Sequence, residues 1–253
     1  MISINTNYGG LYAAKAAQSS QGLVDQAMER LSTGKRINYA KDDAAGQAIA
    51  VRLTAEIQGL AVASRNASDA QSLLDTAEGA LQETTALLLR MRELAVQSSN
   101  GTLAAADRAA LEKEAQALET EITRIADTTT WAGSNLLDSS LSDGVTFQVG
   151  TKSGETITVS IAEMSSSAAT INIAAQSIGT FTDAQAAITA IDGALSGVSE
   201  VRGALGAISN RLNSTIANMD QVRVNLSASV GRIEDADFAQ ETGNLAKNQI
   251  LQQ

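Results

Sequence analysis

Apolar residues return every seven positions over two long stretches of the chain. The first repeat runs from Leu53 to Ala95, with a companion row in which Glu56 is the polar exception. The second repeat runs from Ile191 to Ile233. Such rows predict long helices that each bury one seam against a partner helix. We expect that seam to be formed by Leu53, Leu60, Leu74, Leu81, Leu88, Leu205, Leu212, Met219 and Leu226.

Three shorter amphipathic patterns predict further helices, at about 8–31, 104–127 and 235–253. The sequence Ser32-Thr33-Gly34 is typical of a helix end. Asp42 and Asp43 then supply the cap and first-turn acids of the next helix. The chain therefore predicts a short helix before the first heptad helix and another after the second.

The middle of the chain, about 128–180, has a different composition, with fewer charges and more Ser, Thr and Gly. Residues 145–149 and 156–161 alternate between apolar and polar positions, and 150–155 lie between them. This pattern predicts a small β-hairpin. The expected fold class is mainly α, with long antiparallel heptad helices forming a rod-like bundle and a small β-hairpin region in the middle of the chain.

Composition removes several classes of function. The chain has 253 residues, a net charge of −10 and no His, Cys or Pro. Without His or Cys we expect no catalytic triad, no zinc site of the usual kind and no disulfide. We expect no enzyme, no cofactor and no metal ion. The acidic balance argues against a nucleic-acid partner. We expect no membrane span, because no run of 18 apolar residues occurs, and no Sec-type signal peptide, because no basic segment followed by an apolar one opens the sequence.

Several ordered motifs resemble those of bacterial flagellins. They occur in both halves of the chain, and the unmatched middle, about 138–182, is where that family varies. The matching segments are INTN at 4–7, RLSTGKRIN at 30–38, AKDDAAG at 40–46, RMRELAVQ at 90–97, NLL at 135–137, NRL at 210–212, SVGRI at 229–233 and DADFA at 235–239.

The resemblance implies four parts along the chain. Residues 1–41 would be the N-terminal core helix and the spoke that joins it to the outer tube. Residues 42–180 would be the N-terminal part of the rod domain with the hairpin, and 181–234 its C-terminal part. Residues 235–253 would be the C-terminal core helix, shortened here because flagellins usually continue beyond this position. The short middle implies that large outer domains are absent.

The resemblance also implies function and partners. The chain would polymerise into the extracellular flagellar filament for swimming, after export in an unfolded state by the flagellar type III apparatus. Its partners would be further copies of itself, an export chaperone, the cap protein and the hook–filament junction protein. Flagellins of this type are also recognised by Toll-like receptor 5.

The resemblance implies two sets of candidate contact residues. The receptor and subunit interface would use Arg90, Arg92, Glu93, Leu94, Gln97 and Glu114. The spoke would use Arg30, Leu31, Lys35, Arg36, Asn38, Asp42 and Asp43. The plainer interpretation of the first set is a solvated helix face. The plainer interpretation of the second set is an ordinary capped linker between helices.

Two other functions remain open from the sequence. A hook–filament junction protein shares the terminal design, although its motifs usually match less well. A cell-surface flagellin homologue that binds a ligand such as polysaccharide would need an aromatic platform. The chain holds only three Phe, three Tyr and one Trp, scattered along its length.

Overall fold

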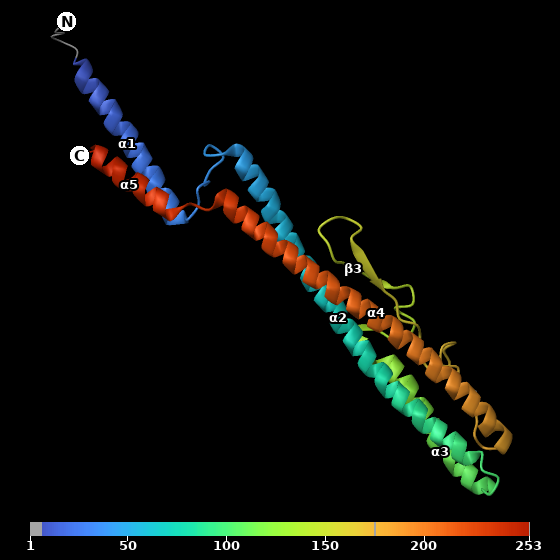
Figure 1. Cartoon of the computed structure of the whole chain (residues 1–253). Helices are drawn as coiled ribbons and strands as arrows, with labels where there is room; N and C mark the ends of the chain where they lie inside the picture. The colour runs from blue at the N-terminus through green and yellow to red at the C-terminus, as the bar shows by residue number, and fades with distance from the viewer. Residues whose placement is uncertain (1–6, 175, 253) are drawn as a thin grey trace. The chain divides into compact units, whose positions relative to one another are not determined.

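The computed structural model describes residues 7–174 and 176–252, which form five helices and two small antiparallel sheets (Figure 1). The mainly α fold with a central hairpin is thereby confirmed. The first part of the INTN motif, residues 4–6, lies outside the described residues. The elements are α1 Tyr8–Thr33, α2 Ala44–Ser98, α3 Ala105–Thr128, β1 Thr130–Trp131, β2 Ser134–Asn135, β3 Val145–Gln148, β4 Thr156–Val159, α4 Phe181–Glu234 and α5 Phe238–Gln252.

The chain divides into two compact units. We call Leu60–Asp220 the central unit, and Met1–Gly59 with Gln221–Gln253 the terminal unit. The long helices α2 and α4 each contribute to both. The heptad repeats alone do not reveal this division, because they continue through the boundary in each helix.

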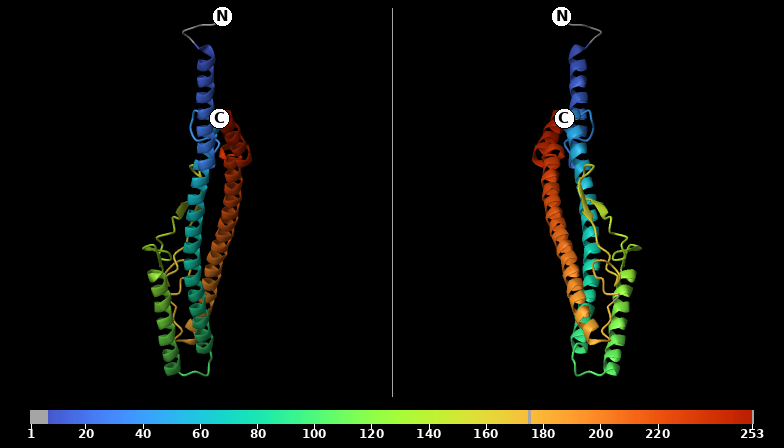
Figure 2. Two further views of the ribbon diagram at one scale, coloured as in Figure 1. Left: turned by 90° about the vertical axis from the view of Figure 1, so that its left-hand side faces the viewer. Right: turned by 90° about the vertical axis from the view of Figure 1, so that its right-hand side faces the viewer.

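In the central unit, α2 and α4 lie side by side and bury the predicted seam (Figure 2). Leu81, Leu88 and Leu212 are fully buried. Burying a leucine side chain contributes about 1.5–3 kcal/mol, so these side chains are a main source of the unit's stability. At the seam's edge, Arg202 forms an ion pair with Glu78 at 2.6 Å. The seam residues Leu60, Leu74, Leu205 and Met219 are also buried in this unit, whereas Leu53 and Leu226, in the terminal unit, are half-buried.

An irregular segment, residues 160–180, fills the space beside α3 (Figure 2). Its Ile and Met side chains are buried, and Ile178 links two helices through its backbone. The Ile178 N–H donates to Glu112 of α3, and its carbonyl accepts from the Ser98 hydroxyl of α2. The backbone carbonyl of Thr170 approaches α4 so closely that a Cβ added at Gly197 would lie 2.6 Å from it. A glycine is therefore required at this contact.

The β-hairpin pairs β3 with β4 in register, with Val145 opposite Val159 and Gln148 opposite Thr156. The side chain of Asn66 on α2 donates to the Gln148 carbonyl at 3.0 Å and fixes the hairpin against the helix. The two-residue pair of β1 and β2 was not expected from the sequence, because its strands are too short to show alternation.

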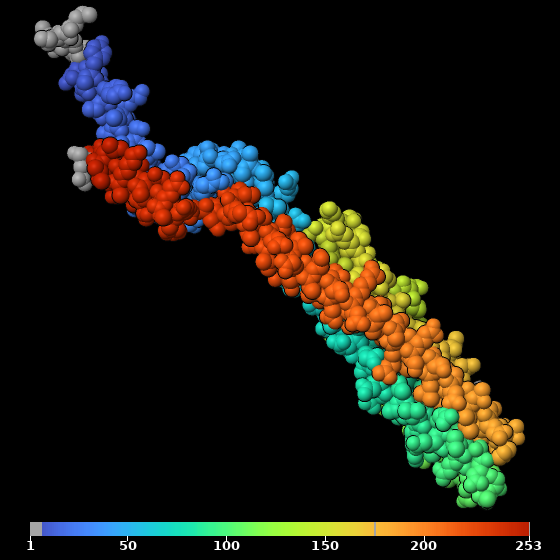
Figure 3. All heavy atoms as spheres, viewed as in Figure 1, coloured from blue at the N-terminus to red at the C-terminus, as the bar shows by residue number. Residues whose placement is uncertain are grey.

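In the terminal unit, α1 and α5 pack antiparallel. Arg30 near the end of α1 meets Glu241 near the start of α5, and Gln21 meets Gln252. The packing of α5 along the second half of α1 is visible in the space-filling view (Figure 3). The predicted end of α1 is confirmed: Gly34 adopts φ 71° and donates its N–H to the Arg30 carbonyl. The buried residues of this helix pair are Val24, Ala27, Glu241 and Asn248.

Candidate interaction surfaces

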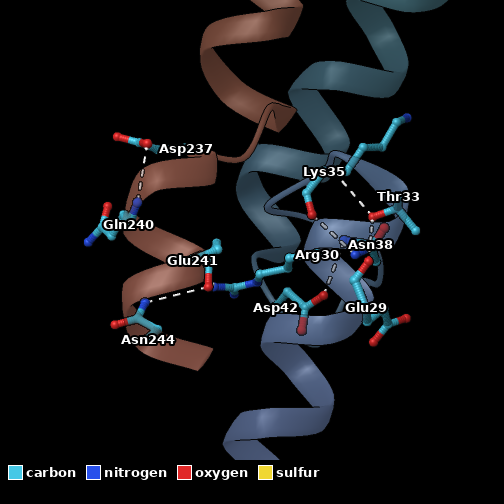
Figure 4. A network of polar contacts seen from close by, with 10 residues as sticks. All are labelled: Glu29, Arg30, Thr33, Lys35, Asn38, Asp42, Asp237, Gln240, Glu241 and Asn244. Carbon is cyan, nitrogen blue, oxygen red and sulfur yellow. Dashed lines mark hydrogen bonds and ion pairs between the residues drawn. The ribbon is translucent and has the colours of Figure 1, made fainter. Parts of the chain in front are cut away.

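The predicted spoke begins with an ion pair between helices. The Arg30 guanidinium donates from Nη1 to Glu241 Oε1 at 2.9 Å, and the two side chains are 22% and 10% exposed (Figure 4). Asn244 lies beside the same carboxylate, with its Nδ2 3.5 Å from Glu241 Oε2. Burying a charge is costly unless it is paired and hydrogen-bonded. The pair therefore fixes how α1 and α5 meet.

The linkers 34–43 and 235–237 are joined through their backbones. Lys35 and Asp235 form an isolated antiparallel β-bridge. The Arg36 N–H donates to the Glu234 carbonyl at 2.6 Å, and the Ala236 N–H donates to the Gly34 carbonyl at 2.9 Å. Side chains reinforce this pairing, since Lys35 Nζ contacts Glu234 Oε2 at 2.8 Å and Arg36 Nη2 donates to the Ile233 carbonyl.

The two adjacent aspartates of the linker accept hydrogen bonds from different parts of the backbone. Asp42 Oδ2 accepts the backbone N–H groups of Tyr39 at 3.0 Å and Asn38 at 3.2 Å, and these bonds hold the loop closed. The Tyr39 N–H is the main reason that the pKa of Asp42 is lowered. Asp43 Oδ1 accepts the Gly46 N–H at 2.8 Å, which is the helix cap predicted for the start of α2.

Gly46 explains part of the AKDDAAG motif. A Cβ at this position would lie 2.5 Å from Asp43 Oδ2 and 2.8 Å from Ile37 Cδ1. Ile37 is buried in the linker. Of the remaining spoke residues, Leu31 is half-buried at the end of α1, and the Asn38 side chain donates to the Lys35 carbonyl. The spoke residues are thus brought together with Glu234 and Glu241 from the other end of the sequence.

The second candidate surface lies on α2 and α3 in the central unit. Arg90 on α2 donates from Nη2 to Glu114 Oε1 on α3 at 2.7 Å and from Nη1 to Glu93 Oε2 at 3.0 Å. The hydrogen bonds to Glu114 are the main cause of the raised pKa of Arg90. All three side chains are about half exposed or more. The Arg90 guanidinium is therefore held on the surface between two carboxylates.

Beside this cluster, α2 presents an exposed face with apolar positions. Leu89 and Val96 are about half exposed and line a shallow groove with Arg92, Glu93 and Gln97. Arg92 is held in place by Asp192 of α4 at 2.6 Å. We call these five groove residues the α2 face. Leu94 turns inward and is fully buried, so it supports this part of the helix from the core.

Sequence reasoning found Arg90 and Glu114 through the resemblance, but it missed several partners. Asp192, Glu234 and Glu241 are distant in sequence from the arginine and lysine residues that they contact. Acidic residues of the same kind occur along all the helices, so composition does not distinguish them. Leu89 and Val96 were missed because they lie outside the two apolar heptad rows of this helix.

Comparisons with known proteins match both ends of the chain. The family description "Bacterial flagellin N-terminal helical region" matches residues 4–142, and "Bacterial flagellin C-terminal helical region" matches residues 188–253. A flagellin of Halalkalibacterium halodurans is 47% identical over 250 residues, which cover 99% of this chain and 92% of that protein. The chain belongs to the bacterial flagellin family. This flagellin is a subunit of the extracellular flagellar filament, as the resemblance implied.

Other relatives agree with this assignment. Flagellin E of Vibrio cholerae is 34% identical to this flagellin. The match covers all of this chain and 94% of the Vibrio protein. The crystal structure of Bacillus cereus flagellin matches with a TM-score of 0.55 and 32% identity, over 61% of this chain and 88% of that chain. A putative flagellar hook-associated protein from Vibrio parahaemolyticus has a TM-score of 0.66, over 77% of this chain and all of that one. At 16% identity, it shows a shared fold alone. None of the helices described in this flagellin is long and apolar enough to cross a membrane.

Proposed function

We propose that this flagellin contacts neighbouring filament subunits through the α2 face, together with Arg90 and Glu114. The observation that supports this most directly is the exposure of Leu89 and Val96, each of which directly follows a fully buried heptad residue, Leu88 or Ala95. Exposed apolar side chains rimmed by charges are typical of protein interfaces. Arg90 and Arg92 are held by Glu114 and Asp192, so less side-chain freedom is lost on binding.

The terminal unit would make the second subunit contact. Tyr8, Leu11 and Tyr12 on α1 and Ile250 and Leu251 on α5 are strongly exposed. Burying these apolar side chains between subunits would remove their surface from water, which is favourable in free energy. The spoke residues, Arg30 to Asp43, would hold the α1–α5 pair in the orientation that assembly needs. We retain the division at 1–41, 42–180, 181–234 and 235–253 for this scheme.

Seeded growth followed by electron microscopy tests the subunit contacts. Short filament fragments would be added to the full chain and to a Leu89→Glu/Val96→Glu variant. We expect the variant to elongate the seeds poorly while its circular dichroism stays unchanged. Val145→Glu is the matched control, because Val145 is also an exposed apolar residue but lies on the hairpin. Equal growth of the variant and the control would remove the α2 face from the interface.

We also propose that the chain is exported unfolded by the flagellar type III apparatus with help from an export chaperone, and that the cap protein and the hook–filament junction protein are further partners. The absence of Cys and Pro supports this route. Neither disulfide formation nor slow prolyl isomerisation then delays refolding after export. Deleting the export apparatus in the source bacterium should leave the protein inside the cell, and secretion in such a strain would contradict the proposal.

Toll-like receptor 5 is the proposed host partner of the monomer. Arg90, Arg92, Glu93, Gln97 and Glu114 would form the contact, and buried Leu94 would support the helix beneath them. A receptor reporter assay tests this with Arg90→Ala and Glu114→Ala, both expected to lower the response to monomer. Arg124→Ala is the control, since Arg124 forms a comparable exposed ion pair with Glu121 on α3. If all three variants signal equally, this surface is not the receptor site.

A further inference from the structure

The turn between α2 and α3 contains the one Asn-Gly pair in the sequence, Asn100-Gly101. Both residues are exposed. A Cβ added at Gly101 would meet nothing within 4 Å, so the space around this peptide bond is open. An asparagine side chain next to an unhindered backbone nitrogen can undergo intramolecular attack, because the two reacting groups are held together by the chain.

Hydrogen bonds to the Asn100 carbonyl favour formation of the nucleophile. Arg108 of α3 donates from Nη2 to this oxygen at 2.9 Å, and the Leu103 N–H donates to it at 3.3 Å. The carbonyl belongs to the same amide as the Gly101 nitrogen. When that nitrogen loses its proton, the negative charge spreads onto the oxygen, where the guanidinium stabilises it. Arg108 is fixed in this position by a second bond, from Nε to the Ser98 carbonyl at 3.0 Å.

A third hydrogen bond makes the carbon that is attacked, Asn100 Cγ, more reactive. The Thr102 N–H donates to Asn100 Oδ1 at 3.1 Å. As a nucleophile adds to Cγ, negative charge develops on Oδ1, and a donor already aimed at that oxygen stabilises the tetrahedral intermediate. Both reacting groups are therefore activated by contacts of the folded turn.

We propose that Asn100 is a site of spontaneous deamidation, with Arg108 as its positioning residue. The Gly101 N–H gives its proton to water or hydroxide, and the nitrogen bonds to Asn100 Cγ. The Cγ–Nδ2 bond breaks and ammonia leaves with a proton from solvent, so that a cyclic succinimide remains. Water then adds to one of the two imide carbonyls and opens the ring to aspartate or isoaspartate. No oxidant or reductant is needed.

The product changes the turn in two ways. A new carboxylate appears next to Arg108, one turn of helix from Gln97 of the α2 face, whose carbonyl accepts the Asn100 N–H at 3.1 Å. Isoaspartate also adds a methylene to the backbone at the point where Arg108 ties α2 to α3. Deamidation would therefore mark old subunits beside a surface that we propose for subunit contact.

Mass spectrometry of the intact chain tests the proposal. The protein would be incubated at mildly alkaline pH, digested with trypsin, and analysed for the peptide spanning residues 93–108, in which Asn100 is the one asparagine. We expect a time-dependent gain of one mass unit at Asn100, with an isoaspartate fraction detected by an isoaspartyl methyltransferase. Asn213 and Asn225, within α4, are internal references that should remain unchanged.

Two variants separate activation by Arg108 from simple exposure. Gly101→Ala should fold normally, because its Cβ has open space, and should slow the reaction several-fold. Arg108→Met should also slow it several-fold in the folded chain, whereas in denaturant it should react at the same rate as the parent. A faster reaction of folded Arg108→Met would show that Arg108 protects the turn. An unmodified Asn100 under conditions that deamidate the free 93–108 peptide would overturn the proposal itself.

Discussion

The two units of this flagellin are stabilised by different means. The central unit buries Leu, Ile and Ala side chains along several helical turns, with Leu81, Leu88 and Leu212 fully inaccessible. In the α1–α5 pair of the terminal unit, two of the four buried residues are polar, Glu241 and Asn248. The contact between α1 and α5 includes an ion pair and side-chain amides in addition to two small apolar residues.

This difference shows where the chain can fold by itself. Apolar burial is non-directional and strong, so we expect the central unit to be stable without outside contacts. Polar pairs contribute less, because each group exchanges bonds to water for bonds within the protein. The terminal helices also expose tyrosines and isoleucine that have no cover within the described residues of the chain. We expect the α1–α5 pair to be fully ordered only where neighbouring subunits cover it.

The largest effect should come from placing a charge in the central core. Leu212→Asp puts an unpaired carboxylate at a fully buried position, which should lower the free energy of unfolding by about 4 kcal/mol or more. Denaturant unfolding followed by circular dichroism measures this. Leu89→Asp is the control, because Leu89 is half exposed on the neighbouring helix. Similar losses in both variants would mean that the seam is not the main source of stability.

A smaller effect should follow from crowding the contact between α4 and the irregular segment. Gly197→Ala brings a methyl group against the Thr170 carbonyl, and overpacking of this kind costs about 1–3 kcal/mol. Gly203→Ala on the same helix meets nothing within 4 Å and should stabilise the chain by about 0.5–1 kcal/mol. Opposite shifts of the unfolding midpoint would verify the close approach, and stabilisation of both variants would contradict it.

In the terminal unit, a polar change should have a local effect. Arg30→Met leaves the Glu241 carboxylate largely buried without its partner, which should cost about 1–3 kcal/mol. Faster hydrogen exchange in α5, with unchanged exchange in α3, is the expected result. Lys35→Met removes a more exposed pair and should cost less than about 1 kcal/mol. If hydrogen exchange in α5 is the same in the two variants, the more buried Arg30 pair does not stabilise the helix pair more than the exposed Lys35 pair does.

The smallest effect concerns pH. Hydrogen bonding to the Tyr39 N–H lowers the pKa of Asp42 in the folded chain. The stabilisation of the loop is therefore complete above about pH 4, the ordinary range of this group, and is lost as pH falls through the lowered folded value. Asp42→Asn should weaken the acid dependence of amide exchange at residues 38–43. An unchanged acid profile in this variant would show that other groups control the loop.

The helices were predictable because their signals are local. The seven-residue repeat gives the long helices, Gly34 marks one helix end, and Asp43 caps the next. The hairpin followed from alternation in two short runs. The irregular segment 160–180 was not predictable, because Ile161, Met164 and Ile178 are buried through contacts with residues that are distant in sequence, such as the Leu141 and Leu137 carbonyls and the Glu112 side chain. Likewise, the pairing of Arg92 with Asp192 joins residues that are far apart in sequence.

The joined linkers of the terminal unit have a mechanical consequence. If α1 and α5 were attached through one connecting strand, rotation about its single bonds would let the pair swivel freely. Here two connections, cross-tied at Lys35 and Asp235 and again between Gly34 and Ala236, resist twisting as a two-stranded strap does. Because the linkers are cross-tied, a twist applied to the α1–α5 pair is transmitted to the adjoining parts of α2 and α4 in the terminal unit.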